Sequence, residues 1–170
     1  MQDSPAETVC AQAPVELALA DARLSVAGPL LRPCSHSIRS LRRLPRHELG
    51  PVQVNCFTGR PVASVLSYAG ARLIDLLDDA GLSSTPRSRL KRCVILAGSQ
   101  DGYQAIFSWN ELYNSPIGAG VLVLYERDGQ ALDTHLGELS LISAHDTQLG
   151  PRHLRLLSSI RSASFELRSA

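Results

Sequence analysis

The chain has 170 residues, of which 44% are hydrophobic and 19% are charged, and its formal net charge is +1. This length and composition predict one domain with a full hydrophobic core. The balanced charge argues against a domain that binds nucleic acid or another polyanion. No apolar run approaches the ~18 residues of a membrane span, so we do not expect the chain to cross a membrane.

The first residues differ in character from the rest of the chain. Residues 1–14 are small, polar and interrupted by proline, which predicts a flexible N-terminal arm. Residues 15–170 are then expected to form the single domain. The N-terminus lacks the basic start and apolar stretch of a signal peptide. We therefore expect a periplasmic location if a leader was removed, and a cytoplasmic one otherwise.

Strand signals and one short helix signal fill the first part of the predicted domain. Residues 15–26 show partial apolar alternation, which predicts a strand or a pair of strands. Apolar residues recur three apart over 38–44, which predicts a short helix that ends before Pro45. Residues 52–56 form a β-rich run that ends in a turn, and residues 60–68 are predicted to be a polar loop.

The middle of the chain carries a clearer helix signal. Residues 73–80 have an amphipathic pattern, and Gly81 follows them as a helix-ending glycine should. Residues 83–92 are rich in Ser, Pro and Arg and are predicted to be a surface loop. Residues 93–97 and 103–107 are predicted to form two strands joined by an Asp-Gly turn.

The last part of the chain predicts further strands. Ser108 and Glu111 have the spacing of a capping box, which predicts the start of a helical turn. Residues 121–125 predict a strand followed by an Asp-Gly hairpin turn. Residues 139–142 and 154–167 are expected to be extended. The whole pattern predicts an α+β fold with mixed β-sheets and short helices.

The strand that ends at Cys56 draws the most functional interest. A cysteine at a strand end lies at the rim of a sheet, where a metal or substrate can reach it. Gly59 permits close backbone approach, and Arg60 offers a planar fork suited to phosphate. On these residues alone, Cys56 as a small buried hydrophobe stays an open alternative.

The remaining cysteines and the histidines show no metal-binding spacing. The four cysteines contain no CxxC pair, and a disulfide between two of them stays open without a preferred pair. The five histidines contain no HxH or HExxH spacing. We therefore do not expect a metal site built from protein ligands alone.

The order of several segments resembles the sulfite-oxidase-type molybdopterin-binding domain family. The resemblance rests on six short matches, which are Leu24–Gly28, Ile38–Pro45, Val54–Cys56, Gly70–Gly81, Asp101–Tyr103 and Gly150–Ile160. They correspond to a strand ending in Gly, an "L-x-x-L-P" helix, a strand ending in Cys, a "G-x-x-L-x-x-L-L-x-x-A-G" helix, a "DGY" turn and a "G-x-[KR]-x-V-K-W-L" segment. The resemblance implies the α+β fold of that family.

The resemblance also implies a cofactor. In that family the cysteine at the strand end supplies the thiolate that binds molybdenum, and Cys56 matches that position. A soft thiolate suits a transition metal whose other positions stay open. Gly59, Arg60, Arg152 and Arg155 are then expected to hold the anionic pterin side of the cofactor.

Three further residues are candidates for this site. His153 is expected to hydrogen-bond the cofactor, with a solvated histidine beside arginines as the alternative. Asp101 and Tyr103 are expected to contact substrate or transfer protons, with an Asp-Gly turn beside a packed tyrosine as the alternative. Together with Cys56, Asp101 and Tyr103 are the predicted catalytic residues.

Two functions follow from the resemblance. The first is a molybdopterin-dependent oxidoreductase that acts on a small-molecule substrate and passes electrons to a separate partner protein. The second is a non-catalytic module of the same fold that has lost the metal and binds an anionic small molecule or a protein partner. In the family the cysteine is followed by "A-G-N-R", whereas here it is followed by Phe57-Thr58-Gly59-Arg60. This departure favours the second function.

Overall fold

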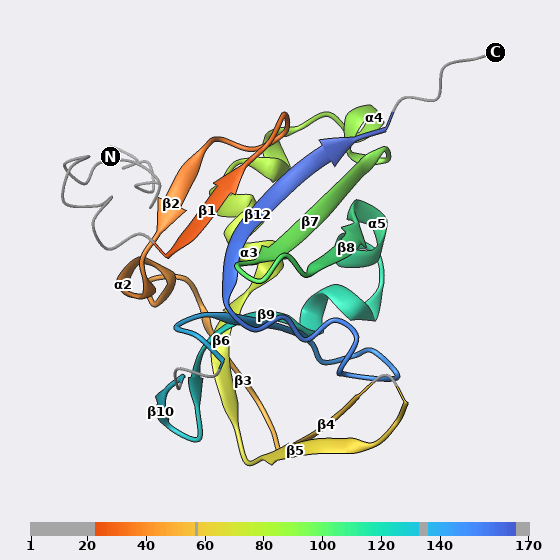
Figure 1. Ribbon diagram of the computed structural model, residues 1–170. Helices are drawn as coiled ribbons and strands as arrows, with labels where there is room; N and C mark the ends of the chain where they lie inside the picture. The colour runs from red at the N-terminus through yellow and green to blue at the C-terminus, as the bar shows by residue number, and fades with distance from the viewer. Residues whose placement is uncertain (1–22, 57, 133–135, 166–170) are drawn as a thin grey trace, which may run out of the picture.

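A computed structural model describes residues 23–56, 58–132 and 136–165. Within these residues the strands form three sheets (Figure 1). The first sheet has the order β2-β1-β12-β7-β8, and its only parallel pair is β1 with β12. Its strands are β1 (Leu24–Ala27), β2 (Cys34–His36), β7 (Cys93–Ser99), β8 (Gln104–Ser108) and β12 (Leu157–Ser164).

The second and third sheets are antiparallel. In the second, β9 pairs with β10, β6 and β11, and β6 pairs with β3. Its strands are β3 (Arg46–Leu49), β6 (Tyr68–Arg72), β9 (Val121–Arg127), β10 (Gln130–Ala131) and β11 (Ser140–Ser143). The third sheet consists of β4 (Val52–Asn55) and β5 (Pro61–Val65).

Short helices connect the strands. The α-helices are α2 (Ile38–Leu41), α3 (Leu73–Asp79), α4 (Arg87–Leu90) and α5 (Trp109–Tyr113), and the 3₁₀ helices are η1 (Leu82–Ser84) and η2 (Pro116–Gly120). The first sheet contains both parallel and antiparallel strand pairs, and short helices connect the strands of the three sheets. The predicted α+β class is therefore confirmed. None of the described helices is long and apolar enough to span a lipid bilayer.

Strand β9 separates two hydrophobic cores. Val121, Val123 and Tyr125 face the larger core, which contains α3 and the first sheet. Leu122 and Leu124 face a smaller core on the side of the β4–β5 sheet. Because both faces of β9 are buried, the strand is apolar at every position from 121 to 125. The smaller core therefore lies between the second sheet and the β4–β5 sheet.

Several local predictions are confirmed. A helix lies within 38–44 as α2, although it ends at Leu41. The predicted helix over 73–80 is α3, and Gly81 has the expected positive φ of 91°. Ser108 and Glu111 make both hydrogen bonds of the capping box at the start of α5. The predicted hairpin turn joins β9 to β10.

Other local predictions are wrong. Residues 60–68 are not a loop, because they contain β5 and the start of β6. β5 begins with a proline, and both Val62 and Ser64 on it are exposed, so the segment lacks the apolar-polar alternation that marks a strand. The predicted surface loop 83–92 contains the end of η1 and all of α4. The arm at residues 1–14 and most of the first predicted strand lie outside the described residues.

Candidate functional site

Cys56 lies in a tight turn that connects β4 to β5. The amide of Cys56 donates a hydrogen bond to the Arg60 carbonyl at 2.9 Å, and the amide of Gly59 donates to the Cys56 carbonyl at 2.8 Å. Gly59 has a φ of 80°, in the left-handed region that favours glycine. This turn leaves Cys56 half-buried at the end of the β4–β5 sheet.

The Cys56 thiol is tuned by a neighbouring hydroxyl. The Thr58 Oγ1 atom lies 2.8 Å from Cys56 Sγ. A hydroxyl that donates to the sulfur stabilises the thiolate, and this hydrogen bond, with backbone amides of the turn, lowers the Cys56 pKa. The thiolate is the form of cysteine that binds metals and attacks electrophiles. The sequence reasoning missed Thr58, whose signal is a hydroxyl two residues after the cysteine.

The segment 150–155 is held against this turn by a glycine. A Cβ atom on Gly150 would lie 1.9 Å from the Asn55 carbonyl oxygen and 3.2 Å from the Cys56 Cα. Only glycine permits such close approach without moving the backbone. The amide of His153 then donates to the Gly150 carbonyl at 3.1 Å. This contact places the loop with the predicted cofactor residues beside the strand that ends in Cys56.

Two buried polar atoms near this junction have no hydrogen-bond partner among the described residues. They are Asn55 Oδ1 and His153 Nε2. The His153 ring packs edge-on against Tyr68, with ring centroids 6.1 Å apart. Burial, and then the positive charges of Arg155 and Arg127, lower the His153 pKa to about 4. His153 is therefore a neutral imidazole at pH 7, and its buried Nε2 atom is available to a hydrogen-bond partner.

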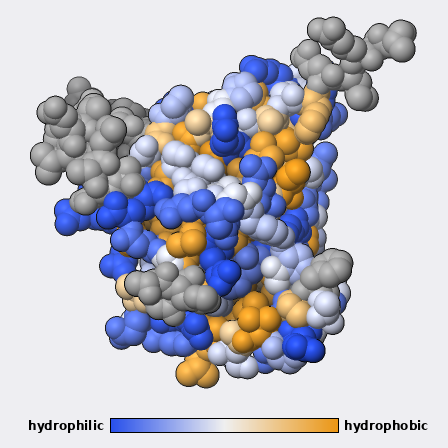
Figure 2. Space-filling view, viewed as in Figure 1, coloured by the Kyte–Doolittle hydropathy of each residue, from blue (hydrophilic) through white to orange (hydrophobic). Residues whose placement is uncertain are grey.

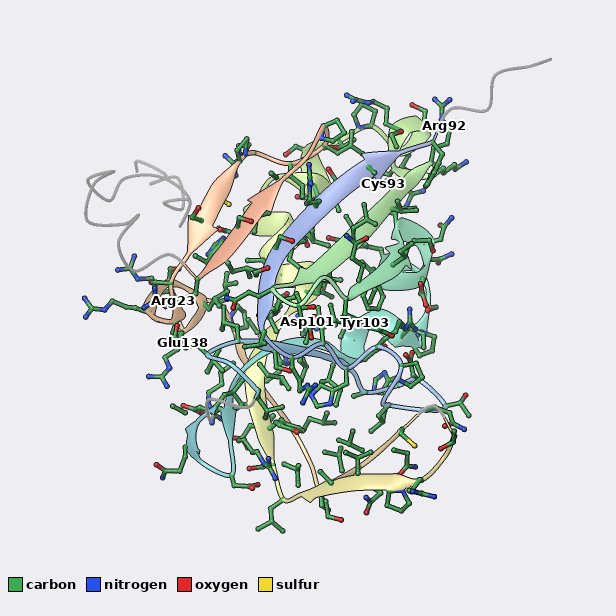
Figure 3. The ribbon with its side chains drawn as sticks, viewed as in Figure 1. Arg23, Arg92, Cys93, Asp101, Tyr103 and Glu138 are labelled. Carbon is green, nitrogen blue, oxygen red and sulfur yellow. The ribbon has the colours of Figure 1, made fainter. Side chains whose placement is uncertain are left out.

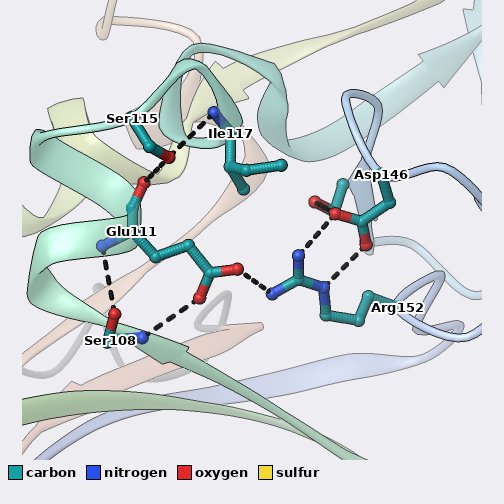
Figure 4. A network of polar contacts seen from close by, with 7 residues as sticks. Ser108, Glu111, Ser115, Ile117, Asp146 and Arg152 are labelled. Atoms are coloured by element: carbon teal, nitrogen blue, oxygen red, sulfur yellow. Dashed lines mark hydrogen bonds and ion pairs between the residues drawn. The ribbon is translucent and has the colours of Figure 1, made fainter.

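Arg152 has a different role from its neighbours. Its guanidinium donates to Asp146 Oδ2 at 2.7 Å and to Glu111 Oε1 at 2.7 Å, as Figure 4 shows. The same group lies 4.5 Å from the centroid of the Phe107 ring. These contacts connect α5 to the loop that precedes β12. They occupy the Arg152 fork with protein carboxylates, so Arg152 is built into the scaffold.

Arg60 and Arg155 are both exposed. Arg60 belongs to the turn that contains Cys56. The charge of Arg155 acts on two candidate residues, because it helps to lower the pKa values of Asp101 and His153. Both arginines therefore lie at the surface within the two segments that meet at Gly150.

Asp101 and Tyr103 lie in the turn between β7 and β8, where Figure 3 labels them. Asp101 accepts hydrogen bonds from the Ser99 hydroxyl and, at 3.1 Å, from the Tyr103 amide. These bonds, the Ser99 bond first, lower the Asp101 pKa. The Tyr103 hydroxyl donates to the Pro151 carbonyl at 2.7 Å. Segment 150–155 therefore contacts the Cys56 turn on one side and the Asp101–Tyr103 turn on another.

Two open cavities lie away from the Cys56 turn. Among the described residues, one cavity is lined by the segment between β1 and β2 and by parts of α3, η1 and α4, and a second lies between α4 and α5. Cys56 lines neither of them. Cys56 and Cys93 are free thiols in the described part of the chain, and Cys10 lies outside it.

Comparisons with known proteins agree with the fold. The family model described as "oxidoreductase molybdopterin binding domain" matches residues 11–138. No curated protein matches the chain. A solved structure, the sulfane dehydrogenase SoxCD from Paracoccus pantotrophus, is similar with a TM-score of 0.61 and 18% sequence identity. The similarity covers 84% of this chain and 38% of the SoxCD chain. On the strength of the family match, this chain belongs to the oxidoreductase molybdopterin binding domain family.

Proposed function

We propose that this chain binds molybdopterin and acts as a molybdenum-dependent oxidoreductase, with the Cys56 thiolate as the protein ligand of the metal. The observation that carries the proposal is the half-buried Cys56 sulfur at a strand end, with its pKa lowered by Thr58. Family membership supplies the cofactor class. When bound, the cofactor supplies oxygen-atom or two-electron transfer to a small substrate.

The residues around Cys56 fit such a cofactor. Asn55 Oδ1 is an acceptor without a donor, and His153 Nε2 is a buried ring nitrogen without a partner. A heterocycle with amino and carbonyl groups at its edge is chemically able to satisfy both atoms. Arg60 and Arg155 add positive charge suited to a phosphate, since guanidinium groups bind phosphate through two parallel hydrogen bonds. Gly59 keeps the turn open, with no heavy atom within 4 Å of a Cβ built on it.

In this proposal the other candidate residues either position segment 150–155 or contact the substrate. Arg152 is a positioning residue, because its ion pairs with Asp146 and Glu111 hold the start of segment 150–155. Tyr103 is 51% exposed and holds the Pro151 carbonyl, so it offers a ring face to substrate. Asp101 stays ionised at neutral pH and contributes negative charge beside it. Electrons leave to a separate partner protein.

Protection of the thiol tests this function. The chain is produced in hosts with and without molybdopterin synthesis, and the alkylation of each cysteine is followed by peptide mass analysis. We expect Cys56 to be protected only in protein from the competent host, because a metal-bound thiolate is not free to react. Cys93, a buried free cysteine, serves as the internal control and should react equally slowly in both samples. Equal, rapid alkylation of Cys56 in both samples would reject the proposal.

A second candidate function is a non-catalytic binding module. It is favoured by the position of Cys56 outside both cavities and by two exposed apolar side chains at the β4–β5 sheet. Figure 2 shows hydrophobic residues among polar ones at that end of the molecule. Val62 is 67% exposed and Leu66 is 78% exposed, and exposed apolar residues of this size suit a protein partner. Under this function, Cys56→Ser leaves ligand binding and the melting temperature unchanged.

A further inference from the structure

Helices α4 and α5 line an open cavity of about 390 Å³ that is separate from the Cys56 turn. Its lining combines cations, aromatic rings and amides, namely Arg87, Lys91, Trp109, Asn110, Tyr113 and Asn114. No acidic side chain lines it among the described residues. Figure 1 shows α4 and α5 next to one another beside the first sheet, above the β4–β5 sheet that carries the Cys56 turn.

The cations of this cavity are not neutralised by the protein. The chain contains no Asp or Glu between Asp79 and Asp101, and within this interval it carries Arg87, Arg89, Lys91 and Arg92. Arg87 and Lys91 are four residues apart and exposed, so they share one helical face. In the described part of the chain, neither is within ion-pair distance of a carboxylate, whereas Arg42, Arg46, Arg72 and Arg152 each are. An excess of positive charge therefore remains at this cavity.

The opposite wall is a rigid aromatic platform. Trp109 and Tyr113 stack with ring centroids 5.8 Å apart and an angle of 18° between the rings. The Tyr113 hydroxyl donates to Asp78 Oδ1 at 2.8 Å, which ties the platform to α3. The capping box of Ser108 and Glu111 fixes the start of the same helix. Both rings are half-buried against the core, so their flat surfaces are preorganised.

We propose that this α4–α5 cavity is a binding site for a small planar aromatic molecule that carries a phosphate group. The stacked rings suit a flat heterocycle, the two cations suit a doubly charged phosphate, and the amides of Asn110 and Asn114 suit polar ring edges. A volume of about 390 Å³ is at the lower end of the usual range for small-molecule sites, about 300–1,000 Å³. It accommodates a mononucleotide-sized ligand.

The chain supplies its own probe for this site. Trp109 is the only tryptophan in the sequence, so tryptophan fluorescence reports on the cavity alone. We would titrate the full chain with AMP, adenosine and inorganic phosphate, and confirm each affinity by calorimetry. We expect AMP to quench Trp109 saturably and to bind at least about tenfold more tightly than either fragment, because it uses both walls. Added salt should weaken AMP binding by screening the phosphate contacts.

Substitutions in and next to α4 distinguish specific AMP binding in this cavity from nonspecific binding of anions to basic residues. Arg87→Ala and Lys91→Ala should each weaken AMP binding about threefold, and about tenfold together. Arg89→Ala removes the same charge from α4 but lines the other cavity, so its AMP affinity should stay within about twofold of the parent. Cys56→Ser should leave AMP binding unchanged, whatever the outcome at the Cys56 turn. The proposal is overturned if AMP binds no more tightly than phosphate, or if Arg89→Ala weakens AMP binding as much as Lys91→Ala.

Discussion

The contact at Gly150 gives the sharpest test of how the Cys56 turn is assembled. A Gly150→Ala substitution would put a Cβ atom 1.9 Å from the Asn55 carbonyl oxygen and 2.9 Å from its carbonyl carbon. Both are backbone atoms, so neither can turn aside as a flexible side chain would. Relief requires movement of either β4 or segment 150–155. Overpacking of this kind costs about 1–3 kcal/mol, and a backbone clash this close puts the expected loss of stability at about 3 kcal/mol.

Chemical unfolding in urea measures this loss, and thermal unfolding should show a decrease in Tm of about 6–12 °C. The matched control is Gly129→Ala. A Cβ on Gly129 meets no heavy atom within 4 Å, and its φ is 76°, so this substitution adds only the strain of the left-handed conformation. That strain costs about 1–2 kcal/mol. If Gly150→Ala is no more destabilising than Gly129→Ala, the close approach of segment 150–155 to the Cys56 turn is wrong.

Three further predictions concern individual side chains. Thr58→Val removes the hydroxyl that lowers the Cys56 pKa, so the pH profile of Cys56 alkylation should move to higher pH; an unchanged profile would contradict this. His153 has a folded-state pKa of about 4, below its unfolded value of about 6.5, so the unfolded chain binds more protons between these pH values. The contribution of His153 to stability is therefore complete above pH 6.5 and decreases by up to about 3 kcal/mol as pH falls to 4. His153→Phe should reduce the dependence of the free energy of unfolding on pH, measured by urea titration at each pH. An equal pH dependence in both proteins would refute this. Arg152→Met should lower the free energy of unfolding by about 2–3 kcal/mol, because it leaves two half-buried carboxylates unpaired. Arg42→Met, at a more exposed ion pair, should lower it by less than about 1 kcal/mol. Equal losses in the two variants would contradict the structural role of Arg152.

The sequence predicts much of the scaffold because its local signals are strong. The run from Val121 to Tyr125 is apolar at each position because β9 has a core on each face. The capping box at Ser108 is a local hydrogen-bond pattern that depends on no distant contact. By contrast, the sequence does not mark β5 as a strand, because β5 begins with a proline and its pairing with β4 decides its conformation. Short edge strands of this kind leave a weak period in the sequence.

In the candidate site too, local sequence signals predict the turn, whereas contacts between residues far apart in the sequence are not predicted. The turn at Cys56 follows from the Gly-Arg-Pro signal that closes the strand. Its meeting with segment 150–155 joins residues nearly a hundred positions apart, and it depends on the missing side chain of Gly150. The fixed role of Arg152 depends on Glu111 and Asp146, which sequence spacing does not bring together. Asn55 becomes a candidate only in the structure, where its side-chain oxygen is buried and has no hydrogen-bond partner among the described residues.

The molybdenum content of the chain tests the central claim most directly. Protein from a molybdopterin-competent host is analysed for metal and visible absorption as the parent, as Cys56→Ser and as Cys34→Ser. We expect the parent and Cys34→Ser to carry molybdenum with a thiolate-to-metal absorption band, and Cys56→Ser to lose the band and most of the metal. Parent protein without molybdenum, or a Cys56→Ser variant with the parent's metal content and spectrum, would contradict the assignment of Cys56 as the metal ligand.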